Sequence, residues 1–149
     1  MSEISDAIQA KCLAFGDRII KLNDFLLEKA ANKKPGYNMV NGKRVYNKSI
    51  PVHLQAISNL CNQLLRAGTS IGANNAEACN AISRQDFRSK SYIALKEARE
   101  SLYWIELLHR NNYLDEKQYN SIYADGEELV KILVARCKKL DDQLKEEKK

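Results

Sequence analysis

Apolar residues recur along this chain at separations that alternate between three and four, with polar residues filling most of the positions between them. That spacing is typical of helices packed side by side in a left-handed bundle. The apolar seam of the first segment consists of Ile8, Cys12, Phe15, Ile19, Leu22 and Leu26. Comparable seams predict four helices, at residues 4–31, 50–81, 84–110 and 115–146.

The second seam passes through two glycines. Its positions are Leu54, Ile57, Cys61, Leu64, Gly68, Ile71, Asn75 and Ala78. The surrounding stretch RAGTSIGANNAEACNA, residues 66–81, has neither the preceding strand nor the Gly-Lys-Ser/Thr ending of a phosphate-binding loop. Since a glycine inside a helix costs about 1 kcal/mol relative to alanine, we expect both glycines to serve close packing between helices.

Short turns near residues 80–84 and 110–115 predict that the second, third and fourth helices run antiparallel to their neighbours. Pro51 suits the first turn of the second helix. Ser83, followed by Asp86, and Asp115 are suited to cap the third and fourth helices. The prediction is an all-α protein: one domain, residues 1–149, folded as an antiparallel up-and-down four-helix bundle.

A turn near residue 82 also predicts which residues of the second and third helices face each other. Gly72 is expected opposite Ser91 and Ala94, and Gly68 opposite Ala98. Small residues on both sides allow two helix backbones to approach closely and gain dispersion contacts.

The same register predicts charged pairs between Glu77 and Arg88 and between Arg66 and Glu100. Asn75 occupies a seam position, which leaves two interpretations open. A polar seam residue commonly fixes the register or the number of subunits, or it is an ordinary amide satisfied inside the bundle.

The connection between the first two helices, NKKPGYNMVNGKRVYNKS (residues 32–49), is the most basic loop of the chain. Asn41-Gly42 is a strong hairpin signal because both positions tolerate positive φ. Two short strands are expected around it, with Tyr37 opposite Tyr46 and Met39 opposite Arg44. An isolated hairpin is marginal in water, so we expect it to lean on the bundle, a neighbouring subunit or a partner.

The net charge of +5 is concentrated in that loop and in the third helix. Basic side chains beside tyrosines suit phosphates and unpaired bases. The candidate nucleic-acid contacts of the loop are Lys33, Lys34, Tyr37, Lys43, Arg44, Tyr46 and Lys48. The alternative is a solvated basic loop or an arm that joins subunits.

A second candidate anion site lies at the start of the third helix, where backbone N–H groups are free and the helix dipole is positive. Its basic residues are Arg84, Arg88 and Lys90. The alternative is a solvated helix face with local ion pairs, because Asp86 and Glu77 are close in sequence or register.

Several other classes of site find little support in the sequence. Glu106-Leu-Leu-His109 has the spacing of a di-iron motif, but such sites need two of these motifs and two further glutamates. The four cysteines have neither paired nor zinc-type spacing and are expected to be reduced structural thiols. No catalytic residues, cofactor or metal are predicted. The absence of a long apolar run or a leader-like start predicts a soluble cytoplasmic chain without membrane contact.

The stretch QLLRAGTSIGANNAEACNAISRQDFRSKSYIALKEARESLYWIELL, residues 63–108, resembles the signature of the four-helix-bundle family named after ribosomal-RNA intervening sequences. KCLAFGDRIIKL in the first helix matches it more loosely. The accessory variability determinant proteins of diversity-generating retroelements belong to the same family. The connection at residues 32–49 departs from the family pattern, because it is longer and more basic than we expect for this family.

The resemblance implies a homopentamer in a barrel-like ring without known catalysis. In the retroelement branch it also implies a basic surface for nucleic acid and a partner reverse transcriptase. We therefore expect a non-enzymatic, homo-oligomeric accessory protein that binds RNA or DNA. The alternative is a structural or protein-binding ring with no nucleic-acid role.

Overall fold

The computed structural model describes residues 3–32, 37–46 and 49–147 and confirms the all-α prediction. Its elements in chain order are α1 (Glu3–Ala31), β1 (Tyr37–Val40), β2 (Lys43–Tyr46), α2 (Ser49–Cys79), α3 (Arg84–Arg110) and α4 (Glu116–Glu146). The predicted helix limits agree with these bounds to within two residues.

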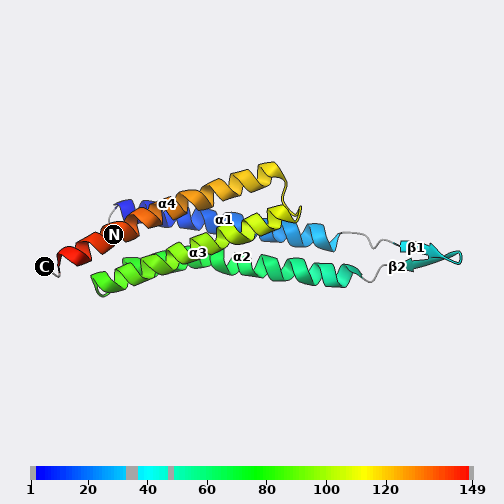
Figure 1. Cartoon of the computed structure of the whole chain (residues 1–149), viewed down its shortest axis with the longest axis horizontal. Helices are drawn as coiled ribbons and strands as arrows, with labels where there is room; N and C mark the ends of the chain where they lie inside the picture. The colour runs from blue at the N-terminus through cyan, green and yellow to red at the C-terminus, as the bar shows by residue number, and fades with distance from the viewer. Residues whose placement is uncertain (1–2, 33–36, 47–48, 148–149) are drawn as a thin grey trace.

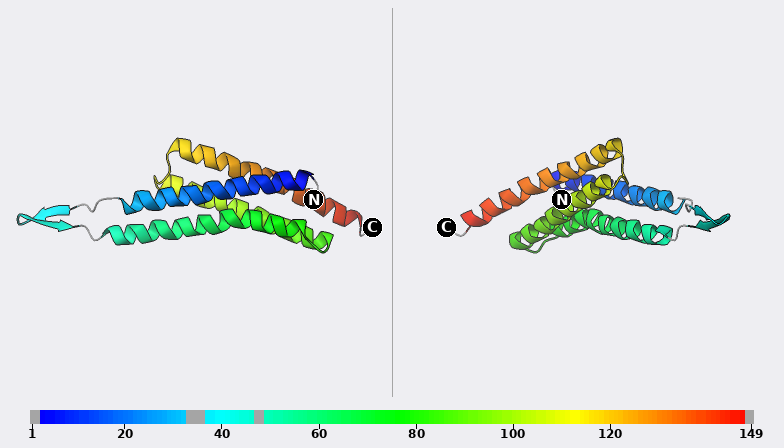
Figure 2. Two further views of the ribbon diagram at one scale, coloured as in Figure 1. Left: turned by 180° about the vertical axis from the view of Figure 1, so that it is seen from behind. Right: turned by 45° about the vertical axis from the view of Figure 1, so that its right-hand side comes forward.

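The four helices form an elongated bundle in which each helix packs against the next one in the sequence (Figure 1). α4 crosses α1 at an angle and touches it less extensively (Figure 2). The β-hairpin projects from the end of the bundle where α1 ends and α2 begins, and both chain termini lie toward the opposite end. Bundle and hairpin are therefore spatially separate parts of the protein.

The helix starts are capped as the sequence predicts. The Ser83 hydroxyl accepts a hydrogen bond from the Asp86 backbone N–H at 3.1 Å and so begins α3. Asp115 and Gln118 form a reciprocal capping box at the start of α4. These bonds satisfy N–H groups that have no partner inside a helix.

The core runs along the seams identified in the sequence. Its largest fully buried side chains include Phe15, Ile19, Ile57, Leu64, Ile71, Ile105, Leu108, Leu129 and Leu133. All four cysteines are free thiols, and burial raises the pKa of Cys12 and of Cys61 to about 11. These two thiols therefore act as small apolar core residues at neutral pH.

Both seam glycines lie inside α2, but the prediction that they face α3 is wrong. A Cβ on Gly68 would lie 2.8 Å from Cγ1 of Ile19, and a Cβ on Gly72 would lie 3.5 Å from Cβ of Cys12. Both neighbours belong to α1. Because α2 packs between α1 and α3, its apolar surface has two contact faces, and the spacing alone does not say which face meets which helix. Ala94 and Ala98 are fully buried on α3.

The predicted partners of two charged residues are also wrong. Glu77 pairs with Lys90 rather than Arg88, which shifts the pairing by half a turn of α3. In the described part of the chain, Arg66 forms no ion pair with Glu100, whose carboxylate accepts from Trp104 Nε1 at 3.1 Å. The antiparallel register of α2 and α3 is thus close to the prediction, but the individual charged side chains have other partners than predicted.

The two glycines should respond differently to the same substitution. Gly68→Ala forces a methyl group into the stiff, buried Ile19, so we expect the free energy of unfolding to fall by about 1–2 kcal/mol. Gly72→Ala makes an ordinary contact and gains helix propensity, so we expect an increase of up to about 1 kcal/mol. Urea denaturation of both variants measures the difference. Equal effects would contradict the close approach of α1 to Gly68.

Candidate functional site

The hairpin has the register that the sequence predicts. Tyr37 pairs with Tyr46 and Met39 with Arg44 in an antiparallel ladder. Asn41 and Gly42 have φ values of 51° and 72°, the left-handed conformation required at both central positions of a type I′ turn. The strands therefore keep the right-handed twist of a regular two-residue hairpin.

The hairpin is exposed and, among the described residues, contacts none of the helices. Lys43 and Arg44 lie on β2 with exposed side chains. Three apolar side chains are exposed beside them, namely Met39, Val40 and Val45. Lys33, Lys34 and Lys48 lie outside the described residues. The candidate contacts of the loop that can be placed thus lie on an arm beyond the bundle, whereas Arg84, Arg88 and Lys90 lie on α3.

The basic residues at the start of α3 are each paired with a carboxylate. Arg84 binds Glu147, Arg88 Nε donates to Asp141 at 2.5 Å, and Lys90 binds Glu77. Asp141 lies near the end of α4 and Glu147 is its C-cap residue, so the end of α4 lies beside the start of α3. An incoming phosphate would have to compete with these carboxylates. The three basic residues therefore act mainly in contacts between helices, and the ion pairs make them a poor site for an anion.

Asp141 is the centre of the contact between α3 and α4. It accepts from the Tyr92 hydroxyl at 2.6 Å and from Arg88, whose guanidinium also lies 4.7 Å from the centre of the Tyr92 ring. The hydrogen bonds from Tyr92 and Arg88 lower the pKa of Asp141. The hydrogen bond that each of them donates to Asp141 raises the pKa of Arg88 and of Tyr92. The ionised carboxylate is therefore the form that this contact stabilises.

Asn75 is fully buried and bonded on both sides within the protomer, which supports the second of its two interpretations. Its Nδ2 donates to Gln9 Oε1 at 2.5 Å, and its Oδ1 accepts from Arg136 at 2.6 Å. Gln9 in turn donates to the carbonyl of Gly72 at 3.4 Å. We call Gln9, Asn75 and Arg136 the polar stitch, because they join α1, α2 and α4.

Glu106 and His109 take part in packing at the turn between α3 and α4. Glu106 accepts from the Tyr119 hydroxyl at 2.6 Å, which raises the Tyr119 pKa to about 12, and also accepts from Arg110. The His109 ring stacks on Tyr119 with ring centres 4.2 Å apart. Within the described ranges, no group of three His, Cys, Asp or Glu side chains is arranged to hold a metal ion.

None of the helices described in the structure is long and apolar enough to cross a membrane.

Comparison with known proteins identifies the family. The family model described as 23S rRNA-intervening sequence protein matches residues 39–135. The chain belongs to this family. A crystal structure of a protein of unknown function from the S23 ribosomal protein family of Bacteroides thetaiotaomicron is similar, with 37% sequence identity and a TM-score of 0.70. The match covers 90% of this chain and 97% of the other. No curated protein matches the chain.

Membership in the family agrees with the resemblance that residues 63–108 carry. The match begins at Met39, inside the hairpin, and so includes β2 with Lys43 and Arg44. Gln9 and Arg136 do not stand out in the sequence. Charged residues also precede the seam residues Leu129 and Leu140, so the position of Arg136 directly before Cys137 is no signal.

Asp141 provides a test of the contact between α3 and α4. Its pKa is lower in the folded protein than its ordinary value of 3.8, so its stabilisation is present above that value and is lost as the pH falls through the folded-state pKa. Asp141→Asn should therefore lower the Tm at pH 7 and leave it nearly unchanged well below pH 3. Thermal melts between pH 2 and pH 8 measure this.

Asp142→Asn is the matched control, because Asp142 makes only a 3.9 Å contact with Lys145. A Tm loss for Asp141→Asn that is the same at every pH would show that the carboxylate charge is not what holds α4 to α3.

Proposed function

We propose that this protein is a non-enzymatic, homopentameric accessory protein that binds single-stranded RNA or DNA through the projecting hairpin. The observation that carries the proposal is the exposure of Lys43 and Arg44 on an arm whose described residues, 37–46, make no contact with the helices. Residues 32–49 hold five basic residues and no acidic one. Phosphate groups are the natural counter-charge for such a segment.

The chemistry of the arm favours an unpaired strand over a duplex. Nucleic acid without sequence preference is held by basic side chains along its backbone and by aromatic faces that stack on bases. The hairpin carries Tyr37 and Tyr46 as a cross-strand pair next to its basic residues. Apolar Met39 and Val45 add surface for contact with base faces.

A ring would strengthen this binding. Several hairpins on one particle convert later contacts into intramolecular ones and raise the overall affinity without any new contact. The accessory variability determinant proteins that the chain resembles are the basis for proposing five subunits. Large apolar side chains that the bundle leaves exposed on α1, namely Leu13, Ile20 and Phe25, are consistent with contacts between subunits.

In the retroelement branch of the family the partner is a reverse transcriptase, and we propose the same kind of partner for this chain. The second candidate function is a ring that binds only protein. The exposed apolar residues Met39, Val40 and Val45 favour it, because such side chains also suit a protein interface.

An electrophoretic shift with generic single-stranded RNA separates these functions. Lys43→Gln with Arg44→Gln should weaken binding and make the slope of log affinity against log salt shallower by about 1.4, since each phosphate contact contributes about 0.7. The control carries Lys96→Gln and Lys138→Gln, two exposed lysines on the bundle. A starting protein that shifts no RNA or DNA contradicts nucleic-acid binding and supports the protein-binding ring.

The proposed assembly has its own test. Light scattering on a sizing column should give about 85 kDa, five times the 17.0 kDa of one chain. The mass should persist when the salt concentration is raised, because burial of apolar surface is less sensitive to screening than surface ion pairs are. A particle of 17.0 kDa at micromolar concentration would exclude the ring.

A further inference from the structure

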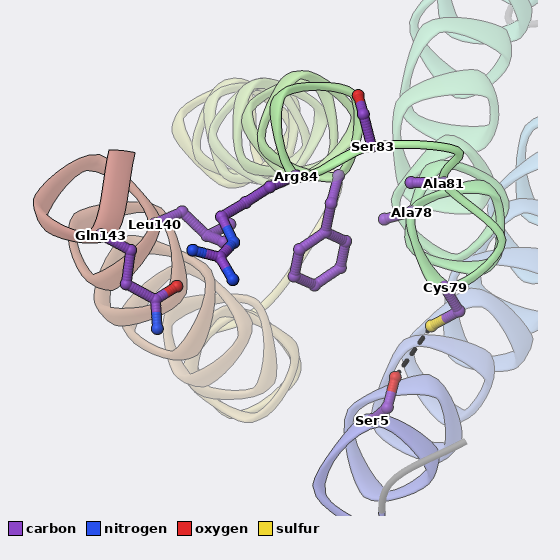
Figure 3. A pocket seen from close by; sticks show the side chains of 9 residues that line it. Ser5, Ala78, Cys79, Ala81, Ser83, Arg84, Leu140 and Gln143 are labelled. Carbon is purple, nitrogen blue, oxygen red and sulfur yellow. Dashed lines mark hydrogen bonds between the residues drawn. The ribbon is translucent and has the colours of Figure 1, made fainter. Parts of the chain in front are cut away.

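A groove opens at the end of the bundle that holds the chain termini, between the start of α1, the end of α2, the start of α3 and the last turns of α4 (Figure 3). It consists of two adjoining pockets of about 530 and 570 Å³. Both are lined by Ser5, Phe87, Leu140 and Gln143. Figure 3 shows Arg84 reaching from α3 toward Leu140 and Gln143 on α4, across from Ser5 and Cys79.

The charges along this groove are of one sign. Its described lining contains three basic residues, Arg84, Arg136 and Lys139, and no acidic residue. Arg84 is neutralised by Glu147. In the described part of the chain, neither Arg136 nor Lys139 forms an ion pair with a carboxylate. Lys139 is exposed, whereas Arg136 is partly buried.

Arg136 is the unusual group, because its charge is partly buried and lacks a counter-charge. Its guanidinium donates one hydrogen bond to Asn75 Oδ1 at 2.6 Å and lies 5.5 Å from the centre of the Phe87 ring. Burial lowers its pKa, yet a guanidinium keeps its proton under all ordinary conditions. Buried charges in proteins are normally paired. The remaining N–H donors of Arg136 therefore suit an anion.

We propose that the groove binds a small carboxylate with an apolar body. The carboxylate pairs with the planar donor fork of Arg136, a geometry that guanidinium groups match with two parallel hydrogen bonds. The apolar body lies against Ile8, Phe87, Ile132 and Leu140. Each pocket falls within the range of roughly 300–1,000 Å³ typical of small-molecule sites.

The lining favours a monoanion over a phosphate. Of the two basic residues of the described lining without a carboxylate partner, Lys139 is exposed and only Arg136 is partly buried, so the buried part of the groove balances a single negative charge. A dianion would have to be desolvated against apolar walls at a much larger cost. This site lies at the opposite end of the bundle from the hairpin, so the proposal is independent of nucleic-acid binding.

Calorimetric titration with octanoate tests the proposal. Octan-1-ol serves as the same apolar body without the charge, and acetate as the charge without the apolar body. We expect octanoate to bind saturably and at least tenfold more tightly than either. Arg136→Gln should weaken octanoate binding at least tenfold, and Lys138→Gln, an exposed charge two residues away, should not change it.

Asn75→Asp is the second variant, because it supplies an internal carboxylate beside Arg136 and should keep the fold, as a thermal melt would show. The affinity of this variant for octanoate should be at least tenfold lower than that of the starting protein. The proposal is overturned if the starting protein does not bind octanoate saturably, if octan-1-ol binds equally well, or if folded Asn75→Asp binds undiminished.

Discussion

The contact of the Ile19 side chain with the bare backbone of Gly68 sets how closely α1 and α2 approach each other. A methyl group at position 68 would already lie 2.8 Å from Ile19 Cγ1, so any larger residue would push the helices apart. Ile19 lies in the middle of α1, and Gly68 lies past the middle of α2. The contact therefore fixes the spacing of the two helices inside the bundle, away from the end that carries the hairpin.

The polar stitch is a second constraint, about two turns further along α2 toward the end of the bundle that holds the chain termini. Arg136 reaches Asn75 although α4 and α2 do not pack directly against each other in the described part of the chain. The hydrogen bonds of the polar stitch hold α1, α2 and α4 in one register. Apolar contacts alone specify a register weakly, because they have no preferred direction. Arg136 also lines the groove beside Phe87, so the stitch and the groove share one side chain.

The sequence is sufficient to predict where the helices and strands lie along the chain, but not which side chains of different helices touch. Seam spacing locates the helices, Ser83 and Asp115 locate two helix starts, and Asn41-Gly42 locates the hairpin, because each depends on local backbone preferences. Contacts across the bundle depend on rotation of each helix about its axis. A change of half a turn moves Gly68 from α3 to α1 and replaces Arg88 by Lys90 as the partner of Glu77. Arg136 was missed for the same reason, since its surroundings come from three helices.

The separation of the hairpin from the helices has an evolutionary consequence. Residues 39–45 contribute no packing to the bundle, so substitutions there leave the folding of the helices nearly untouched. Each seam residue, in contrast, is restrained by close-packed neighbours. Selection for stability therefore restrains the bundle much more tightly than it restrains the arm.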